Sequence, residues 1–351
     1  MRILDSQKIG YKFIHTGQHY DYNLSSQFFE EFGIPKPDYT IDLTEVSSQP
    51  ARQISRIILK ADDILEEFAP SLVLVQGDTN SVLASSLAAA KRDIPIAHLE
   101  AGLRSEDWKT TEEHNRRVVD HLSDILFAPT IDSARNLENE RVKGDIHLVG
   151  NTAIDAVSLF LDQVENNNHG RGNSNERSNV ACSDSADFVL VTLHRADNVD
   201  NIEFLKNVLL ALNQSELNYI FPVHPHTAKR IREFRLEGLI TQTIKIIEPV
   251  NYSNFLWLLK KCKFVITDSG GVQEEITYPS INKHALVLRN STERPESVRS
   301  GHAVLCRPSG SSSILQAIKV VEKLDNAEGL SPYGDGNTAE RVVQILQRYK
   351  I

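Results

Sequence analysis

The chain has 351 residues, which is long for one hydrophobic core and fits two domains. Its composition, 40% hydrophobic and 24% charged residues, is that of a soluble globular protein. The net charge of -9 argues against a nucleic-acid-binding protein, because an acidic surface repels a polyanion. A small phosphorylated ligand remains possible, since local dipoles and a few arginines are enough to hold it.

The cysteines and the N-terminus indicate a reducing compartment. Cys182, Cys262 and Cys306 form no CxxC pair and are odd in number, which is typical of free thiols. No stretch approaches the roughly 20 apolar residues of a membrane span, and the residues after Met1 lack the apolar core of a signal peptide. We therefore expect a cytoplasmic protein with no membrane partner.

In the first half of the chain, short apolar runs alternate with amphipathic runs. The runs that predict strands are 12–15, 71–75, 94–98, 124–128 and 146–149. The runs that predict helices are 55–68, 81–91 and 115–122. Nearly continuous apolar strands between helices indicate a parallel sheet that is covered on both faces.

The alternation breaks at 166–185, where Asn, Ser, Gly and charged residues dominate, and then resumes. The later predicted strands are 188–192, 219–221, 244–247, 264–266 and 285–288, and a final helix is predicted at 338–349. The pattern predicts an α/β protein with two doubly wound domains and a ligand cleft between them. The predicted parts are an N-terminal domain at 1–165, a linker at 166–185, a C-terminal domain at 186–335, and a C-terminal helix at 336–351 that packs back on the first domain.

A candidate phosphate-binding turn lies at Thr267–Gly271. It follows a predicted strand and precedes a predicted helix, so its glycines and free N–H groups can approach an anion, and Ser269 adds a hydroxyl donor. The alternative is an ordinary βα turn in which Asp268 or Ser269 caps the helix. One turn further on, Glu275 either accepts hydrogen bonds from ribose hydroxyls or lies on a solvated helix face.

Three acidic residues are expected at one edge of the first sheet. Asp78 and Glu100 follow neighbouring predicted strands, and Glu112 opens a predicted helix. Carboxylates that gather in one place become usable as proton donors and acceptors near neutral pH. A metal site is the weaker interpretation, because no ligand spacing indicates one. The alternatives are a helix N-cap for Asp78 and a favourable helix-dipole position for Glu112.

Cationic groups are expected at strand ends of the second domain. His194 and Arg195 follow its first strand, where they suit the charge that develops on a leaving phosphate. The alternative for His194 is a hydrogen bond to a nearby loop. Arg294 begins a predicted helix, where a cation is unfavourable, and an anionic ligand would remove this difficulty.

Taken together, eight segments resemble the non-hydrolysing UDP-N-acetylglucosamine 2-epimerase family over nearly the full chain. Each segment is a weak signal alone, but eight in the family's order are highly specific. They are TGQHYD (16–21), VQGDTNSVLA (75–84), AHLEAGLRS (97–105), EEHNRRVVDHLSD (112–124), VGNTAIDAV (149–157), TLHRADNVD (192–200), TDSGGVQEE (267–275) and STERPE (291–296).

The resemblance implies two Rossmann-like domains of the glycosyltransferase-B type, with the UDP-sugar in the cleft and no cofactor. A base would remove the C2 proton while UDP leaves C1, and UDP would then re-add with a proton delivered to the other face. This sequence interconverts UDP-GlcNAc and UDP-ManNAc. The resemblance also implies a homodimer and a role in polysaccharide biosynthesis.

Site residues follow from the matching motifs. Asp78, Glu100 and Glu112 would be the acid/base carboxylates, without an assignment of which one takes the proton, and His194 would assist departure of UDP. Ser269, Gly270 and Gly271 would bind phosphate, and Glu275 the ribose. The other predicted substrate-binding residues are Gln18, His19, Arg116, Arg195 and Arg294.

One departure from the family concerns the beginning of the chain. The family opens with a strand and a G-T-R-P-E loop well before TGQH, whereas Thr16 here lies fifteen residues after Met1. The first βα unit is therefore expected to be absent, and the first sheet to lack a central strand.

Three alternatives to the first function follow. One is a 2-epimerase that acts on a related UDP-diacetamido uronic acid sugar, and the second is a non-catalytic or truncated UDP-binding remnant. The third is a glycosyltransferase of the same architecture, against which three carboxylates for C2 chemistry argue.

Overall fold

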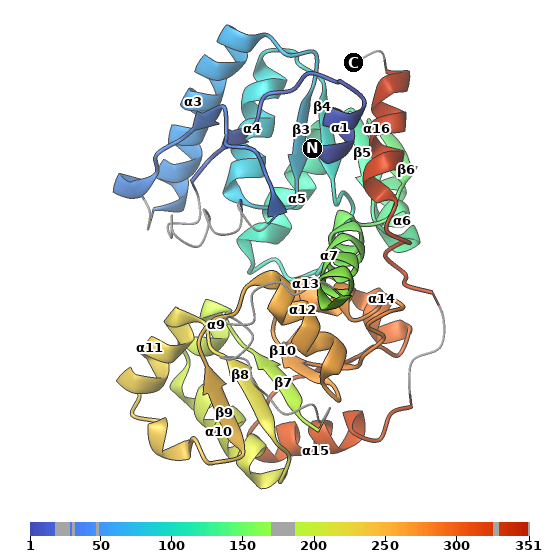
Figure 1. The fold of residues 1–351 in the computed structure, drawn as a ribbon. Helices are drawn as coiled ribbons and strands as arrows, with labels where there is room; N and C mark the ends of the chain where they lie inside the picture. The colour runs from blue at the N-terminus through green and yellow to red at the C-terminus, as the bar shows by residue number, and fades with distance from the viewer. Residues whose placement is uncertain (18–28, 30–31, 47–48, 170–186, 326–329, 350–351) are drawn as a thin grey trace. The chain divides into compact units, whose positions relative to one another are not determined.

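The computed structural model describes residues 1–17, 29, 32–46, 49–169, 187–325 and 330–349. Two compact units divide the chain, and each is built on parallel strands and helices (Figure 1). Unit 1 comprises Met1–Thr152 together with Gly336–Ile351, and unit 2 comprises Ala153–Asp335. Among the described residues, no helix has the length and apolar character needed to span a membrane.

Unit 1 contains a four-stranded parallel sheet in which spatial order follows chain order, β3-β4-β5-β6. Its strands are β3 (Val73–Gln76), β4 (Ile96–Leu99), β5 (Ile125–Ala128) and β6 (Asp145–Leu148). The helices between and after them are α4 (Asn80–Lys91), α5 (Thr111–Leu122) and α6 (Ile131–Glu140). All residues of β5 are buried, as expected for an inner strand with helices on both faces. The carboxyl ends of β3 and β4 therefore meet at one sheet edge.

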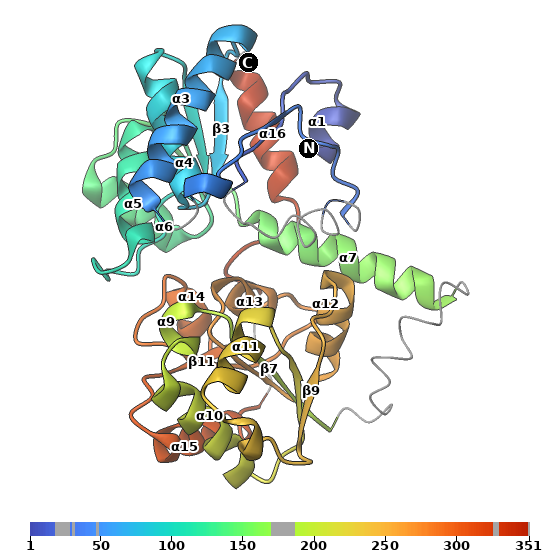
Figure 2. The same ribbon diagram turned by 90° about the vertical axis from the view of Figure 1, so that its left-hand side faces the viewer.

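A second, two-stranded parallel sheet lies in the same unit. It pairs β1 (Ile14–His15) with β2 (Tyr39–Thr40), and it is separate from the larger sheet in the described residues. The helix α3 (Pro50–Phe68) packs against α4 in both ribbon views (Figures 1 and 2). On β3, at the border of the described four-stranded sheet, Leu74 is 40% exposed.

The amphipathic pattern of α3 explains its place. Its buried residues recur every four positions, and the helix presents two of them to different clusters. Ile57 packs with Ile41 and Leu43, which follow β2, whereas Leu65 packs with Val75 of β3. One helix therefore supports both sheets of unit 1. The short elements α1 (Arg2–Ser6) and η1 (Thr44–Val46) complete this part of the chain.

The last helix, α16 (Thr338–Arg348), belongs to unit 1 although it lies at the end of the chain. Val342 and Leu346 are buried and pack with Ile125 and Phe127 of β5. Its N-terminal part is also tied to the strand layer, because Arg341 donates a hydrogen bond to the carbonyl of Val149 at 3.1 Å. The end of the chain thus covers one face of the first sheet.

Unit 2 contains a six-stranded parallel sheet with the order β12-β11-β10-β7-β8-β9. Its strands are β7 (Val189–Thr192), β8 (Tyr219–Pro222), β9 (Ile244–Ile247), β10 (Val265–Thr267), β11 (Ala285–Leu288) and β12 (Ala303–Cys306). The chain builds outward from β7 to β9 and then restarts at β10 on the other side. The order therefore reverses between β7 and β10, and ligands of doubly wound sheets bind at such a switch point.

The helices of unit 2 cover both faces of this sheet. They are α7 (Thr152–His169), α9 (Ala196–Val199), α10 (Ile202–Gln214), α11 (Pro225–Glu233), α12 (Tyr252–Lys261), α13 (Gly270–Glu275), α14 (Pro295–Arg299) and α15 (Ser311–Val321), with a 3-10 turn η2 (Glu237–Leu239). The largest core cluster joins the inner strands to α10 and α15. The predicted α/β fold of two Rossmann-like units is confirmed.

The division between the units differs from the predicted boundary at residue 165. Unit 2 begins at Ala153, so α7 is counted with the second unit. The contacts of α7 explain this: Phe160 packs edge-on against Tyr252 at a ring distance of 5.4 Å, and Tyr278 donates a hydrogen bond to Ser158 at 2.9 Å. Most of the predicted linker, 166–185, lies outside the described residues.

Candidate active site

The loops after β3 and β4 carry Asp78 and Glu100, as the sequence predicted for neighbouring strands. Asp78 is half-buried, and its carboxylate lies 2.5 Å from the Arg116 guanidinium. Glu100 is also half-buried and accepts a hydrogen bond from Gln76 at 2.9 Å. Its φ of +66° is unusual for a residue with a side chain. Such backbone strain persists only where surrounding contacts hold it, and it is common at functional sites.

The third predicted carboxylate, Glu112, lies in the first turn of α5 and is exposed. The same helix reaches the Asp78 loop through Asn115, whose side-chain amide donates to the Asp78 carbonyl at 2.9 Å. Thr79, not Asp78, is the N-cap of α4, so the capping alternative for Asp78 does not describe this loop. The structure therefore ties together the three segments that carry the predicted carboxylates.

Beneath these loops lies a continuous network of acidic and basic side chains. Glu113 is fully buried, although its neighbour Glu112 is exposed, and it pairs with Arg116 and Arg117. From there the network runs through further ion pairs to the buried His98, and it closes on Gly77, the residue before Asp78. In order, its members are Asp78, Arg116, Glu113, Arg117, Glu140, Arg104, Asp120, His98 and Gly77.

The ionisation of the network follows from its pairing. Burial would raise the pKa of Glu113, but hydrogen bonds from Ser105, the charge of Arg116 and a hydrogen bond from Arg117 outweigh burial and lower it. The same balance holds for Asp120, where burial is outweighed by His98 and Arg104. Both carboxylates are therefore ionised at neutral pH and hold their cationic partners in fixed positions.

In unit 2, the predicted phosphate turn lies at the carboxyl end of β10, on one side of the switch point. Ser269 is the N-cap of α13 and Gly270 is the first residue of that helix. The carboxylate of Asp268 is fully buried and turns toward the loop after β7. There it accepts the backbone N–H groups of His194 and Arg195, each at 3.1 Å. The buried aspartate thus joins the two loops that flank the switch point.

This junction also orients His194. Its Nδ1 lies 3.4 Å from the Asp268 carboxylate, and its side chain is 44% exposed. Asn198 adds a further bond, since its amide donates to Asp268 at 3.1 Å and to the carbonyl of Leu288 at 3.2 Å. With Nδ1 facing a carboxylate, Nε2 is the ring nitrogen available to a ligand.

An arginine cluster lies beside the turn. Arg294, the N-cap of α14, bonds to Glu293 at 2.6 Å and to Glu274 at 2.8 Å. These two carboxylates already neutralise a cation at the helix start, so the dipole argument by itself no longer requires an anionic ligand there. Glu293 also pairs with Arg289 at 2.8 Å and lies 3.6 Å from Arg195.

The charge of Glu293 is firmly fixed by these contacts. Burial would raise the pKa of Glu293, but Arg294 and Arg289 outweigh burial and hold it far below the usual value. A Cβ placed on Gly270 would lie 2.8 Å from Glu293 Oε1 and 3.1 Å from Arg294 Nη1. The glycine therefore allows the turn to approach the charged cluster.

Glu275, at the end of α13, is buried and does not lie on a solvated face. Its Oε1 accepts a hydrogen bond from the Tyr252 hydroxyl at 3.0 Å. Its Oε2 is buried and has no hydrogen-bond partner in the part of the chain that the structure describes. Burial raises the pKa of Glu275 to about 7, and the Tyr252 bond only partly offsets it. An unpaired carboxyl of this kind is ready to accept hydroxyl donors from a ligand.

Comparisons with known proteins agree with this arrangement. The family model described as UDP-N-acetylglucosamine 2-epimerase matches residues 2–347. The chain belongs to this family. The UDP-N-acetylglucosamine 2-epimerase of Methanococcus maripaludis is 41% identical over 95% of this chain and 90% of its own length. The crystal structure of the Methanocaldococcus jannaschii UDP-GlcNAc 2-epimerase in complex with UDP-GlcNAc and UDP superposes with a TM-score of 0.87 at 38% identity, covering 99% of this chain and 94% of that one.

A family relative of different specificity is less similar. The UDP-2,3-diacetamido-2,3-dideoxy-D-glucuronate 2-epimerase of Pseudomonas aeruginosa is 35% identical over 99% of this chain and 94% of its own length. The alternative of a diacetamido uronate epimerase is not favoured, because relatives of about 40% identity and the UDP-GlcNAc-bound structure are UDP-GlcNAc 2-epimerases.

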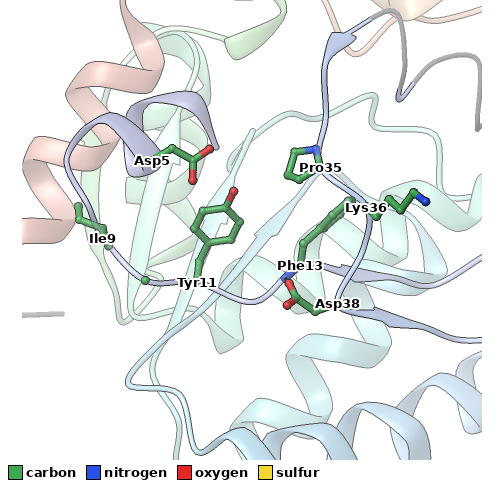
Figure 3. A pocket seen from close by; sticks show the side chains of 8 residues that line it. Asp5, Ile9, Tyr11, Phe13, Pro35, Lys36 and Asp38 are labelled. Atoms are coloured by element: carbon green, nitrogen blue, oxygen red, sulfur yellow. The ribbon is translucent and has the colours of Figure 1, made fainter.

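Two predicted site residues of the family motif, Gln18 and His19, lie outside the described residues. A pocket of about 350 Å³ occurs elsewhere in unit 1, where Tyr11 lies beside Asp5 of α1 and Phe13 lies beside Lys36 of the segment before β2 (Figure 3). None of the candidate residues lines it. In the described ranges, no group of three or more His, Cys, Asp or Glu side chains is arranged to hold a metal ion.

The groups that sequence reasoning missed are those that support the site from within. His98, Asp120, Glu113 and Glu293 lie inside quoted family motifs, yet none was assigned a role. Asp268 was considered only as a helix cap. For His98 and Asp268 the signal in the sequence is a polar or charged residue at the end of an apolar strand, which is costly to bury unless it is paired. Glu113 and Asp120 lie in α5 and Glu293 in the loop before α14, where a charged residue gives no such signal.

Proposed function

We propose that this chain is a non-hydrolysing UDP-N-acetylglucosamine 2-epimerase that interconverts UDP-GlcNAc and UDP-ManNAc. The observation that carries the proposal is that this chain, a member of the family, has two kinds of functional loop. Unit 2 has a glycine turn beside arginines at the switch point of its sheet, and unit 1 has carboxylates after neighbouring strands. The turn suits a diphosphate, and the carboxylates suit proton transfer at a carbon.

UDP is assigned to unit 2. Ser269, Gly270 and Gly271 offer backbone N–H groups and a hydroxyl to the diphosphate, with Arg195 and Arg294 as nearby cations. Glu275 accepts the ribose hydroxyls through its unpaired oxygen. His194, held by Asp268, donates from Nε2 to the phosphate oxygen that gains charge as UDP departs.

The sugar chemistry is assigned to unit 1. One of Asp78, Glu100 and Glu112 removes the C2 proton, the C1–O bond breaks, and the electron pair leaves with UDP, giving 2-acetamidoglucal. In the reverse direction UDP re-adds at C1 and a carboxylic acid delivers a proton to the opposite face of C2. In this proposal Arg116 holds the carboxylate of Asp78 in position, because the two side chains form an ion pair.

Isotope exchange tests the proposal directly. Incubation of the chain with UDP-GlcNAc in deuterated water should place one deuterium at C2 of both epimers, detected by mass spectrometry and proton NMR. Asp78→Asn should abolish incorporation while leaving UDP affinity unchanged. A folded chain that binds UDP but incorporates no deuterium would refute the epimerase and support the non-catalytic alternative.

Two finer assignments have their own measurements. A panel that includes UDP-diacetamido uronic acids should show higher kcat/KM for UDP-GlcNAc, and the reverse preference would reassign the substrate. We also propose a homodimer, which light scattering after size exclusion would test as a mass of twice 39.4 kDa.

A further inference from the structure

The third residue of β4, His98, is completely buried and lies between the two loops that carry Asp78 and Glu100. Its Nε2 is 2.8 Å from the carbonyl oxygen of Gly77, the residue before Asp78. Its Nδ1 is 2.7 Å from Oδ1 of Asp120, which is also completely buried. The imidazole therefore bridges the Asp78 loop to the core of α5.

The partners of the ring decide how many protons it carries. A carbonyl oxygen can only accept, so Nε2 must donate to Gly77. The Asp120 carboxylate takes the N–H of Gly102 at 3.1 Å and Arg104 Nη2 at 2.8 Å on its other oxygen, which is the environment of an ionised carboxylate. An ionised carboxylate also only accepts, so Nδ1 must donate as well. The ring thus holds both protons and is an imidazolium.

The surroundings favour this charged state in spite of burial. Burial alone would lower the pKa of His98, but the hydrogen bond and the charge of Asp120 outweigh it, with smaller contributions from Gly77 and Glu100, and the pKa is raised. The facing charged groups are Asp120 of α5 and Arg104 of the loop after β4, with Glu140 of α6 next in line.

We propose that His98 is a positioning residue that, as a permanent buried imidazolium, fixes the Gly77 carbonyl and thereby places Asp78 and Glu100 for proton transfer. This inference rests on the proposed function, because it assigns those two carboxylates to the reaction. His98 does not touch the sugar: its own side chain is enclosed. Its contribution is geometric, since Gly77 has a φ of +80° and begins the short loop between β3 and α4 that carries Asp78.

The first measurement needs no activity. Selective ¹⁵N labelling of histidine, with the His98 signal identified by its loss in His98→Gln, should show both ring nitrogens protonated near neutral pH. A ring with one protonated nitrogen would overturn the proposal. This result stands whether or not the chain is an epimerase.

Two conservative variants then separate the two hydrogen bonds. In His98→Gln the amide nitrogen can reach the position of Nε2 and donate to Gly77, whereas in His98→Asn it reaches only the position of Nδ1 and donates to Asp120. We expect kcat to fall by roughly 10- to 100-fold in His98→Asn, and less in His98→Gln, because a displacement of about 1 Å at the reacting groups costs this much. KM and UDP affinity should change little.

His147→Asn is the matched control. His147 lies in β6 of the same sheet, where its Nε2 contacts the Tyr349 hydroxyl at 3.2 Å, and its replacement should leave kcat unchanged. Equal kcat in wild type and His98→Asn, or the opposite order of the two His98 variants, would overturn the proposal. A parallel loss of UDP affinity and kcat would mark general damage and would also overturn it. If neither variant folds, the His98 ring signals of the wild type are assigned instead through its backbone resonances, and the ring spectrum decides.

If the wild-type chain incorporates no deuterium from any UDP-sugar, the proposed function fails, and the ring spectrum still reports the state of His98. The two failures are therefore distinguishable.

Discussion

Replacing Glu275 with glutamine should stabilise the protein in mildly alkaline solution and have little effect in mildly acidic solution. The carboxyl is buried, with one bond from Tyr252 and one oxygen unpaired, and burial raises its pKa to about 7. Glutamine keeps the size of the side chain and can still accept the Tyr252 bond. The substitution therefore removes the ability to ionise and leaves the packing in place.

The magnitude follows from the difference between the folded and unfolded pKa of Glu275. The unfolded value is 4.5 and the folded value is about 7, so in this interval the folded state retains a proton that the unfolded state has released. Stability must then fall as pH rises through the interval, and the full loss is present above about pH 7. At about 1.4 kcal/mol per pKa unit, the loss in wild type is about 3 kcal/mol. The glutamine variant has no such loss.

Urea unfolding at about pH 5 and about pH 8 measures the effect. Of the two tryptophans, Trp257 lies in α12 of unit 2 and Trp108 in unit 1, so a Trp108→Phe background makes fluorescence report unit 2. The difference in unfolding free energy between Glu275→Gln and its parent should grow by about 2.5 kcal/mol from the acidic to the alkaline condition, because a small part of the loss is already present at about pH 5.

Glu274→Gln is the matched control, because this adjacent buried carboxylate is paired with Arg294 at 2.8 Å. It should destabilise the protein by about 1–3 kcal/mol, since it leaves a charged donor less well satisfied. The reasoning about Glu275 is refuted if its glutamine variant shows the same stability difference at both pH values, or is less stable than its parent at the alkaline one.

Three further substitutions test other parts of the site. Asp268→Ala removes the carboxylate that anchors the His194 loop, so the unfolding free energy should fall by about 2–4 kcal/mol. The rate of deuterium incorporation at C2 should fall by at least about tenfold. Unchanged urea unfolding and exchange curves would contradict this expectation. Gly270→Ala places a Cβ 2.8 Å from the carboxylate of Glu293 and 3.1 Å from the guanidinium of Arg294. Because the ends of these side chains can shift, we expect a native fold by circular dichroism and about tenfold weaker UDP binding by calorimetry. Unaltered binding would argue against a close approach of the ligand at this glycine. Gly102→Ala combines a φ of +83° with a Cβ that would lie 2.2 Å from a backbone carbonyl oxygen, so it should lower the unfolding free energy in urea by about 3 kcal/mol or more. Gly238→Ala is the control, because its Cβ would meet open space among the described atoms, and it should cost under about 1 kcal/mol. Equal losses in the two variants would refute the strain argument.

Much of the fold could be predicted because apolar runs reveal buried parallel strands. The predicted strands of unit 2 from residue 188 to 288 fall within one residue of β7, β8, β9, β10 and β11. Two strands were missed. β2 is only two residues long, which is too short for an apolar run to reveal it. β12 (Ala303–Cys306) is an apolar run of four residues, as long as the predicted β11, so its sequence carried a signal that was overlooked.

The candidate site was predictable as a set of loops but not as a set of contacts. The position of Asp78 and Glu100 after neighbouring strands follows from parallel topology alone. The pairing of Asp78 with Arg116, 38 positions later, depends on how α5 lies against the sheet, which periodicity does not specify. The pairing of Arg294 with Glu274 was not predictable for the same reason, because a strand and a loop separate the two residues in the sequence.

The two units stabilise their functional loops in the same physical way. A loop at a strand end has few backbone hydrogen bonds of its own, so a buried charged side chain supplies them. In unit 1 the His98 ring donates to the carbonyl of Gly77, and in unit 2 the Asp268 carboxylate accepts from the backbone of His194 and Arg195. Each buried charge is balanced by further ions or by several N–H groups, which keeps its cost low and its geometry rigid. Substitutions at these enclosed groups should therefore lower the rate of the reaction more than they weaken the binding of the ligand, because they displace reacting groups without removing a ligand contact.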